Sequence, residues 1–193
     1  MAMSDNLYAP PQADLRMPAV REPAFYTVSE GKFFTLFFAS LGLYLVYWSW
    51  KHWRRYRQFT GADVSPLARG LLPVFFTHAL LFCAQDLLHQ RGLHYSEPPQ
   101  RWANRFVLST VLGLVFNAMA RNDIGYPLTD LGCLAMLVVQ GLAACKGQQL
   151  LNFAADDPLG ESNARLGWVD YLCLVPGLLV WVFILLVYWA DAA

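Results

Sequence analysis

The sequence predicts an all-α integral membrane protein, a bundle of about five transmembrane helices. The first observation is a set of five apolar stretches with turn-forming residues between them: Phe33–Trp50, Leu67–Gln85, Phe106–Ala120, Leu128–Cys145 and Tyr171–Trp189. Each approaches the ~20 residues that a helix needs to cross a hydrocarbon layer of ~30 Å. Five such stretches in 193 residues leave too little polar sequence to cover them all in water.

The composition is the second observation. Apolar residues make up 56% of the chain and charged residues 15%, against about 45–50% and about 25% in soluble domains. The length leaves room for one bundle and no second folded domain. The net charge is zero, without an extended basic field, which argues against nucleic acid as a partner. The four cysteines show no metal-binding or paired spacing, so we expect free thiols.

Two regions are expected: a disordered, Pro-rich N-terminal tail over residues 1–24 and a helical transmembrane domain over residues 25–193. The tail contains four prolines and few large apolar side chains, so it cannot bury enough surface to offset the entropy lost on ordering. Thr27 and Glu30 have the spacing of a capping box, which predicts that the first helix begins there and runs through Phe33–Trp50 toward Gln58.

The next two helices have clear starting signals. Ser65 is a good N-cap with Pro66 at the first helical position, and Pro73 should kink the second helix or mark its effective start. The third helix is expected to begin near Gln100–Trp102 and to reach Ala120.

A short turn follows over residues 121–127, so the third and fourth helices should be antiparallel neighbours. Thr129 or Asp130 can cap the fourth helix. The fifth should begin near Val169–Asp170 and bend at Pro176-Gly177.

The number of spans depends on the first apolar stretch. Five crossings distribute Lys and Arg almost evenly over the two sides of the membrane, whereas a re-entrant first stretch concentrates them on the side of the tail. The positive-inside rule therefore favours the re-entrant alternative. Against it, an uninterrupted run of this length can cross, so five spans remain the leading prediction.

An aromatic and basic belt ends the first stretch and provides the first candidate site. Tyr and Trp favour the headgroup level, and Lys and Arg favour cytoplasmic loops. One interpretation is an interfacial belt that fixes topology; the other is a specific site for an anionic lipid or phosphate. The possible headgroup contacts are Lys51, Trp53, Arg54, Arg55 and Arg57.

His78 is a candidate polar intramembrane site, since ionisable groups are costly at membrane depth and often functional. A packing role, with one hydrogen bond from a neighbouring helix, is the simpler interpretation. Asp86, His89 and His94 could supply metal ligands, but their spacing is a weak pattern. Gln148, Gln149 and Asn152 would project from a helix end into a solvated connection or a polar binding mouth.

No nucleophile elbow, phosphate-binding loop, dinucleotide fingerprint or metalloprotease motif occurs, so we predict no catalytic residues, no metal and no cofactor. The leading hypothesis is a non-enzymatic membrane protein that acts by association with membrane lipids, with other membrane proteins or with itself. The alternative is a small transporter or channel subunit, and the third hypothesis is a metal-dependent intramembrane enzyme.

Three patches carry a family resemblance: the leader 6–13, the block from Phe25 to Trp53 with its G-x-Y-x-x-Y-W pattern, and Gln148-Gln149 with Asn152 and Asn163. Together they resemble small uncharacterised multi-pass bacterial inner-membrane proteins with an N-P-Y-A-P-P-x-A-like leader. Leu7, where proline is usual, departs from that pattern. The resemblance implies a bacterial inner-membrane location and brings no catalytic or binding residues with it.

Overall fold

The structure, a computed structural model, describes residues 22–192, and every regular element in that range is helical. The elements are α1 (Glu30–Ala39), α2 (Tyr44–Thr60), α3 (Pro66–Leu71), α4 (Pro73–Gln90), α5 (Pro99–Ala120), α6 (Leu128–Ala154), the 3₁₀ turn η1 (Glu161–Asn163) and α7 (Trp168–Ala192). The predicted tail lies outside the described residues except for residues 22–24, of which Ala24 is buried.

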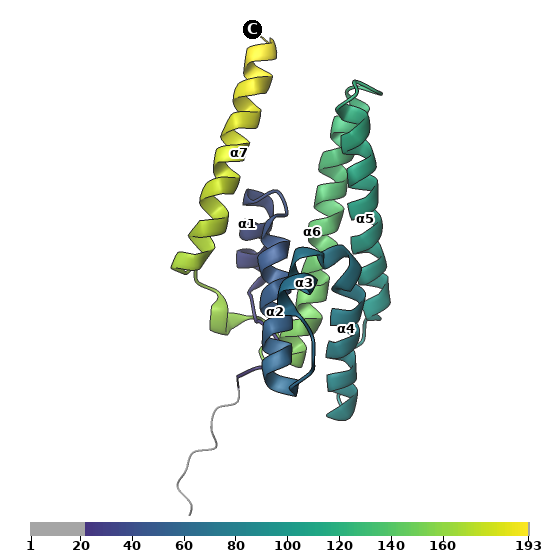
Figure 1. The fold of residues 1–193 in the computed structure, drawn as a ribbon, viewed down its shortest axis with the longest axis vertical. Coiled ribbons are helices and arrows are strands. Elements are labelled where there is room, and N and C mark those ends of the chain that lie inside the picture. The colour runs from purple at the N-terminus through teal and green to yellow at the C-terminus, as the bar shows by residue number, and fades with distance from the viewer. Residues whose placement is uncertain (1–21, 193) are drawn as a thin grey trace, which may run out of the picture.

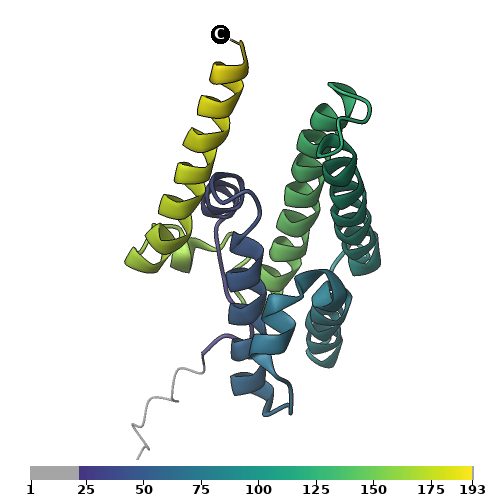
Figure 2. The same ribbon diagram turned by 45° about the horizontal axis from the view of Figure 1, so that its top comes forward.

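The helices form a broad base with two arms (Figure 1). We call residues 22–98 and 143–167, the lower part of Figure 1, the base. One arm is the antiparallel α5–α6 hairpin and the other is α7; both rise from the base toward the same end. α1 lies between the arms, packed on α6 and on α7. It is seen nearly end-on in Figure 2 and so runs obliquely to the longer helices.

The first apolar stretch is two helices, so the expected continuous helix is wrong. The chain turns between Ser40 and Leu43, where Leu41 and Gly42 both have positive φ (52° and 85°); glycine adopts this conformation without strain. The Ser40 hydroxyl accepts a hydrogen bond from the Tyr44 N–H (2.9 Å) at the start of α2.

The chain therefore returns toward its starting end. Glu22, before α1, lines one cleft together with Gln58 and Phe59 at the end of α2. The first apolar stretch therefore follows the path of the re-entrant alternative, in which the chain turns back toward the side of the tail.

The second apolar stretch is also divided. The Ser65 side chain caps α3, with Pro66 as its first residue, and Pro73 is the first residue of α4. These starting signals are confirmed. α5, α6 and α7 are long and apolar enough to cross a membrane, so the structure shows three candidate spans in place of about five.

Several helix ends differ from expectation. The side chain that caps α1 is Ser29, which accepts from the Lys32 N–H, whereas Thr27 contacts Ser162 (2.9 Å). Neither Thr129 nor Asp130 provides a side-chain cap for α6.

α7 continues through Pro176 as one helix. A Cβ added to Gly177 would lie 2.1 Å from the Ala39 carbonyl oxygen, so glycine allows the close approach of α7 to the end of α1. The Trp181 indole N–H donates to the Phe38 carbonyl (3.0 Å) near the C-terminal end of α1, which adds a polar contact between the two helices.

The core lies in the base, and its largest fully buried side chains are aromatic. Phe33 of α1 packs edge-to-face against Tyr44 and Trp48 of α2, with ring centroids 5.8 and 6.4 Å apart. The arms are different, because only 17–28% of each candidate span is buried. Large apolar side chains on their surfaces are exposed to the surroundings.

Candidate functional site

The base is organised around a buried, extended segment of the chain, residues 24–28. Its five side chains are at most 6% exposed. An extended segment outside a sheet leaves backbone N–H and C=O groups without partners, and burying them unpaired would be costly. Side chains from α2 and α6 provide the missing partners.

Gln148 and Asn152, one turn apart on α6, serve this backbone. Asn152 pairs with Val28 in both directions: its amide donates to the Val28 carbonyl (2.8 Å), and its oxygen accepts from the Val28 N–H (3.1 Å). Gln148 donates to the Tyr26 carbonyl (2.9 Å) and to the Asn152 oxygen (2.7 Å). Both side chains are 1% exposed. They reproduce within a helical fold the pairing that a neighbouring strand would supply.

His52 and Trp48 on α2 complete the network. The His52 Nδ1 accepts from the Tyr26 N–H (3.3 Å), which leaves the proton on Nε2 to donate to the Gln148 oxygen (3.1 Å). The Trp48 indole N–H donates to the same oxygen. Burial lowers the pKa of His52 to about 3, against the effect of its hydrogen bond to Gln148. His52 is therefore neutral and held in one tautomer.

A buried ion pair joins α1 to the start of α7. Lys32 Nζ lies 2.7 Å from an Asp170 carboxylate oxygen, and both side chains are at most 5% exposed. The ammonium also donates to the Asn163 side-chain oxygen (2.7 Å) and to the Arg165 carbonyl (2.8 Å). Asn163 in turn donates to the Thr27 carbonyl (2.9 Å). Asp170, in the first turn of α7, also accepts a hydrogen bond from the Gly167 N–H (2.6 Å), which directly precedes that helix.

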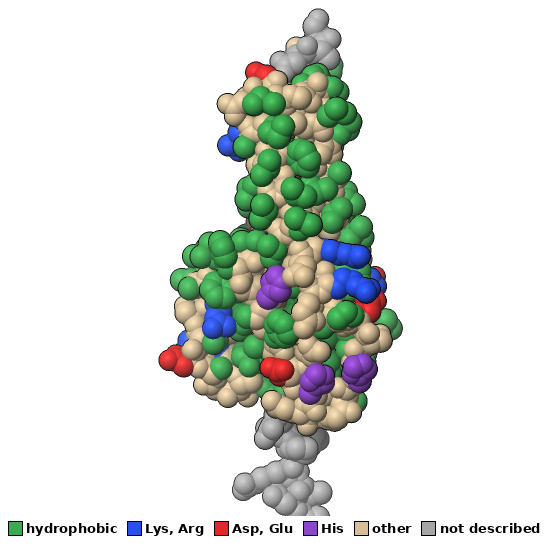
Figure 3. Space-filling model, turned by 90° about the vertical axis from the view of Figure 1, so that its right-hand side faces the viewer, with side chains coloured by type: hydrophobic (Ala, Val, Ile, Leu, Met, Phe, Trp, Pro, Cys, Tyr) green, Lys and Arg blue, Asp and Glu red, His purple; other side chains and the backbone are tan. Residues whose placement is uncertain are grey.

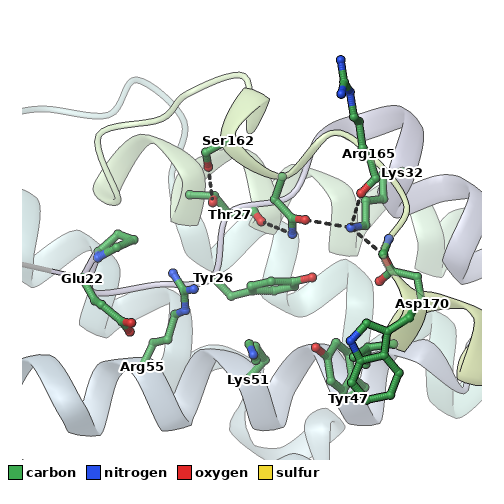
Figure 4. A pocket seen from close by; sticks show the side chains of 15 residues that line it. Glu22, Tyr26, Thr27, Lys32, Tyr47, Lys51, Arg55, Ser162, Arg165 and Asp170 are labelled. Atoms are coloured by element: carbon green, nitrogen blue, oxygen red, sulfur yellow. Dashed lines mark hydrogen bonds and ion pairs between the residues drawn. The ribbon is translucent and has the colours of Figure 1, made fainter.

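Beside this network lies a cleft of ≈ 610 Å³, which we call the basal cleft (Figure 4). The extended segment, α2 and the connection into α7 form its walls. Its charged lining residues are Glu22, Lys32, Lys51, Arg55, Arg165 and Asp170, and its aromatic ones are Tyr26, Tyr47 and Trp168.

The basal cleft carries an excess of positive charge. Lys32 and Asp170 neutralise each other, which leaves three cations on the lining and Glu22 as the opposing carboxylate. Among the described residues, no carboxylate lies within ion-pair distance of Lys51 or Arg55. The pKa of Lys51 is lowered, first by burial and then by Arg55 and Arg54. An anion in the cleft would relieve this repulsion.

The five predicted headgroup contacts lie in three different environments. Lys51 and Arg55 line the basal cleft, whereas Arg54 and Arg57 are exposed elsewhere on α2. Trp53 is fully buried, and the Arg69 guanidinium lies 4.2 Å from the centre of its ring. The Trp53 side chain is therefore part of the core and is not open to a headgroup.

His78 lies outside the three candidate spans, on α4, where its Nε2 is 2.7 Å from the Asn104 side-chain oxygen on α5. This is the packing contact with a neighbouring helix that the simpler interpretation expects. The structure contains no group of three or more potential metal ligands among the described residues, so Asp86, His89 and His94 gain no support as a metal site. All four cysteines are free, as predicted.

The roles of the most connected residues of the base could not be predicted from local sequence patterns. Gln148 and Asn152 were expected to project into a solvated connection or a binding mouth, but α6 continues to Ala154 and places them in the core. Their spacing on one helix face was visible in the sequence. The buried Lys32–Asp170 pair gave no local signal, because its members are far apart in the chain.

The fold and the site thus define an all-helical protein with three candidate membrane spans and a cleft in its base that is lined by an excess of cations. Comparison of the chain with protein-family models, curated proteins and solved structures finds no match.

Proposed function

We propose that the chain is a three-span membrane protein, with α5, α6 and α7 crossing the bilayer. The support is the apolar surface of the arms, which would have no cover in water. On the face shown in Figure 3, hydrophobic side chains cover the narrow upper part, and the histidines lie on the broader lower part. At ~1.5 Å per residue, the three helices are ~30 Å or longer.

The distribution of charge supports an orientation. Of the Lys and Arg residues that the structure describes, Arg121 alone lies at the α5–α6 turn, and the others lie in the base or in the parts of α5 and α6 next to it. By the positive-inside rule, the base faces the cytoplasm. The resemblance to bacterial inner-membrane proteins fits this orientation and makes that membrane part of the proposal.

In this orientation α1 and α2 enter the bilayer from the cytoplasmic side and return to it. Irregular backbone at membrane depth must be covered by protein. The turn meets this condition, because Gly42 lies against Phe37 and Gln140, and the Leu41 and Gly42 N–H groups donate to Phe38 and Phe37 carbonyls.

The function that this geometry favours is association with anionic membrane lipids, without catalysis. The basal cleft carries the proposal, because Lys51 and Arg55 lie beside the first residues of α7, where that candidate span begins. This is the level of lipid phosphates, and Tyr26, Tyr47 and Trp168 are residue types that favour it. Lys51 and Arg55 would bind a phosphate by charge-assisted hydrogen bonds.

The orientation is tested first, with single cysteines introduced into a variant that lacks the four native ones. A cysteine at Gln58 should be labelled from the cytoplasmic side, and one at Asn122 from the opposite side. Labelling of both positions from one side would overturn the three-span arrangement.

Lipid binding is tested with protein purified in detergent and titrated with dioctanoyl phosphatidylglycerol. The expected result is a rise in Tm that is clearly smaller in Lys51→Gln/Arg55→Gln than in the wild type. The matched control is Arg54→Gln/Arg57→Gln, which removes the same charge from the same helix outside the cleft and should keep the rise. Equal losses in the two double variants would reject the basal cleft as the site.

The returning α1–α2 segment is the feature that favours the transporter alternative, since re-entrant segments often line a substrate path. Here the space beneath the return is filled by Phe33, Tyr44 and Trp48, all at most 1% exposed. Lipid association is therefore the better supported proposal.

A further inference from the structure

A second cavity, away from the basal cleft, runs along α6 between α1 and α5. It has a volume of ≈ 590 Å³, and we call it the α6 groove. Its apolar lining consists of Phe34 from α1 and Val139, Leu142, Ala143 and Cys145 from α6. Val139 and Leu142 are 38% and 51% exposed, so the apolar part opens to the surface of the molecule.

The other part of the α6 groove is cationic. Arg105 on α5 and Lys146 on α6 both contact the ring of Trp102, with the guanidinium carbon 4.6 Å and the ammonium nitrogen 5.9 Å from its centre. The indole N–H of Trp102 donates to Glu97, which anchors the ring (2.5 Å). An immobilised aromatic ring that holds two cations makes a preorganised site for a phosphate.

The lining of the α6 groove contains two cations, Arg105 and Lys146, and one carboxylate, Glu30, whereas Glu97 lies outside the lining. Lys146 Nζ lies 4.0 Å from Glu97, at the limit of an ion pair. Glu30, also on the lining, accepts a hydrogen bond from the Gln149 amide (2.5 Å). Among the described residues, no carboxylate lies within ion-pair distance of Arg105. The groove therefore has room for one more negative charge.

The cationic and apolar parts of the α6 groove lie in the order that the proposed membrane orientation requires for a bound lipid. Trp102 and Arg105 lie in the first two turns of α5, next to the base, and Val139 and Leu142 lie farther along α6 toward the other end. A lipid in the cytoplasmic leaflet has the same order, with its phosphate near the base and its acyl chains pointing to the middle of the bilayer.

We propose that the α6 groove holds one anionic phospholipid, with its phosphate between Arg105 and Lys146 and one acyl chain against Phe34, Val139 and Leu142. This inference rests on the proposed membrane orientation but not on the basal cleft, because the two cavities share no lining residue. A bound lipid would fill the space between α1 and α5 and tie the returning segment to the hairpin arm.

The test is native mass spectrometry of the detergent-purified full chain, with dioleoyl phosphatidylglycerol and dioleoyl phosphatidylcholine added in parallel. These two lipids have the same acyl chains and differ in headgroup charge. On the Lys51→Gln/Arg55→Gln background, which removes lipid binding in the basal cleft, the chain should retain one phosphatidylglycerol in clear excess over phosphatidylcholine. Adding Arg105→Gln/Lys146→Gln to this background should lower the retained phosphatidylglycerol about tenfold, as expected when charge-assisted bonds are lost.

Two further variants separate the site from its alternatives. Val139→Trp, at a partly exposed position, should fill the apolar part and lower retention of both lipids with little effect on folding. Arg101→Gln, an exposed residue of α5 outside the groove, should change nothing. Lys51→Gln/Arg55→Gln should also keep the lipid, which distinguishes this site from the basal cleft.

Equal retention of the two lipids on the Lys51→Gln/Arg55→Gln background would overturn the proposal. So would the same loss in Arg101→Gln as in Arg105→Gln/Lys146→Gln. Full displacement of phosphatidylglycerol by inorganic phosphate would show an anion site without an acyl chain and would overturn it as well.

Discussion

The base and the arms of this protein are held together in different ways. The base has a buried aromatic core and a hydrogen-bonded network in which Gln148 and Asn152 pair with the extended segment. The arms expose most of their apolar residues. The hairpin arm contacts the base mainly through α4 and α1, and α7 contacts it mainly through α1. The base is therefore stabilised by its own packed core, whereas the arms leave exposed the apolar surface that lipid covers in the proposed arrangement. Four predictions sharpen this difference, from the largest expected effect to the smallest.

Gln148→Leu should have the largest effect on the base. It leaves the Trp48 and His52 donors and the Tyr26 carbonyl buried without a partner, and each such loss costs ~1–3 kcal/mol. We expect a loss of about 3–5 kcal/mol in the free energy of unfolding, measured by denaturation in detergent. Gln140→Leu, a neighbour on α6 with one hydrogen bond to Thr110, should cost about 1 kcal/mol. Similar costs for the two variants would contradict a network centred on Gln148.

Acid should weaken the base through His52. Because burial lowers the pKa of His52 from 6.5 to about 3, the unfolded chain binds a proton between these values that the folded chain does not. The free energy of unfolding should then fall by about 1 kcal/mol for each pH unit from pH 6.5 down toward pH 3. Chemical denaturation at several pH values measures this slope. His52→Gln should remove it, and His89→Gln, at an exposed position, should keep it.

Gly177→Ala should loosen the arm formed by α7. The added methyl group would lie 2.1 Å from the Ala39 carbonyl oxygen, so α7 must move away from the end of α1, at a cost of about 1–3 kcal/mol. Thermal unfolding of the variant should show a lower Tm than that of Gly113→Ala. The methyl group at Gly113 meets Met136 at an ordinary contact distance of 3.5 Å. An equal Tm in the two variants would mean that the α1–α7 contact contributes little.

Trp48 and Trp53 form a matched pair within the core, because both are on α2 and at most 1% exposed. The Trp48 indole donates to Gln148, whereas the Trp53 indole N–H is buried without a partner among the described residues. Trp48→Phe should therefore cost about 1–2 kcal/mol more than Trp53→Phe in the free energy of unfolding. The reverse order would indicate that ring packing alone decides the contribution of both residues.

Local sequence patterns predicted much of the helical structure. Ser65 with Pro66, Pro73, and the turn before Leu128 each mark a helix boundary within a few residues, because caps and prolines act through neighbouring backbone atoms. The prediction of one helix over Phe33–Trp50 was wrong because long-range contacts, and not local signals, decide where that stretch turns. Its apolar residues continue through Leu41 and Gly42, and the turn there is stabilised by α6 and α7, which are distant in the sequence.

The candidate site was likewise predicted where its signal is local and missed where it depends on long-range contacts. Lys51 and Arg55 were identified from the aromatic and basic belt, since clustered cations beside Tyr and Trp are a local signal. Their separation from Trp53, Arg54 and Arg57 depends on which face of α2 packs against the core. Gln148, Asn152 and the Lys32–Asp170 pair became visible only through their contacts with residues 24–28 and with one another.

The sequence by itself determined the all-helical class, the apolar character of α5, α6 and α7, and most places where helices begin. These properties depend on composition, periodicity and capping, all of which act over a few residues. Tertiary structure alone decided that the first stretch returns, that the extended segment is buried against α6, and which cations share a cleft. Each of these outcomes depends on polar groups from distant parts of the chain satisfying one another in the core, and such partners cannot be assigned from spacing alone.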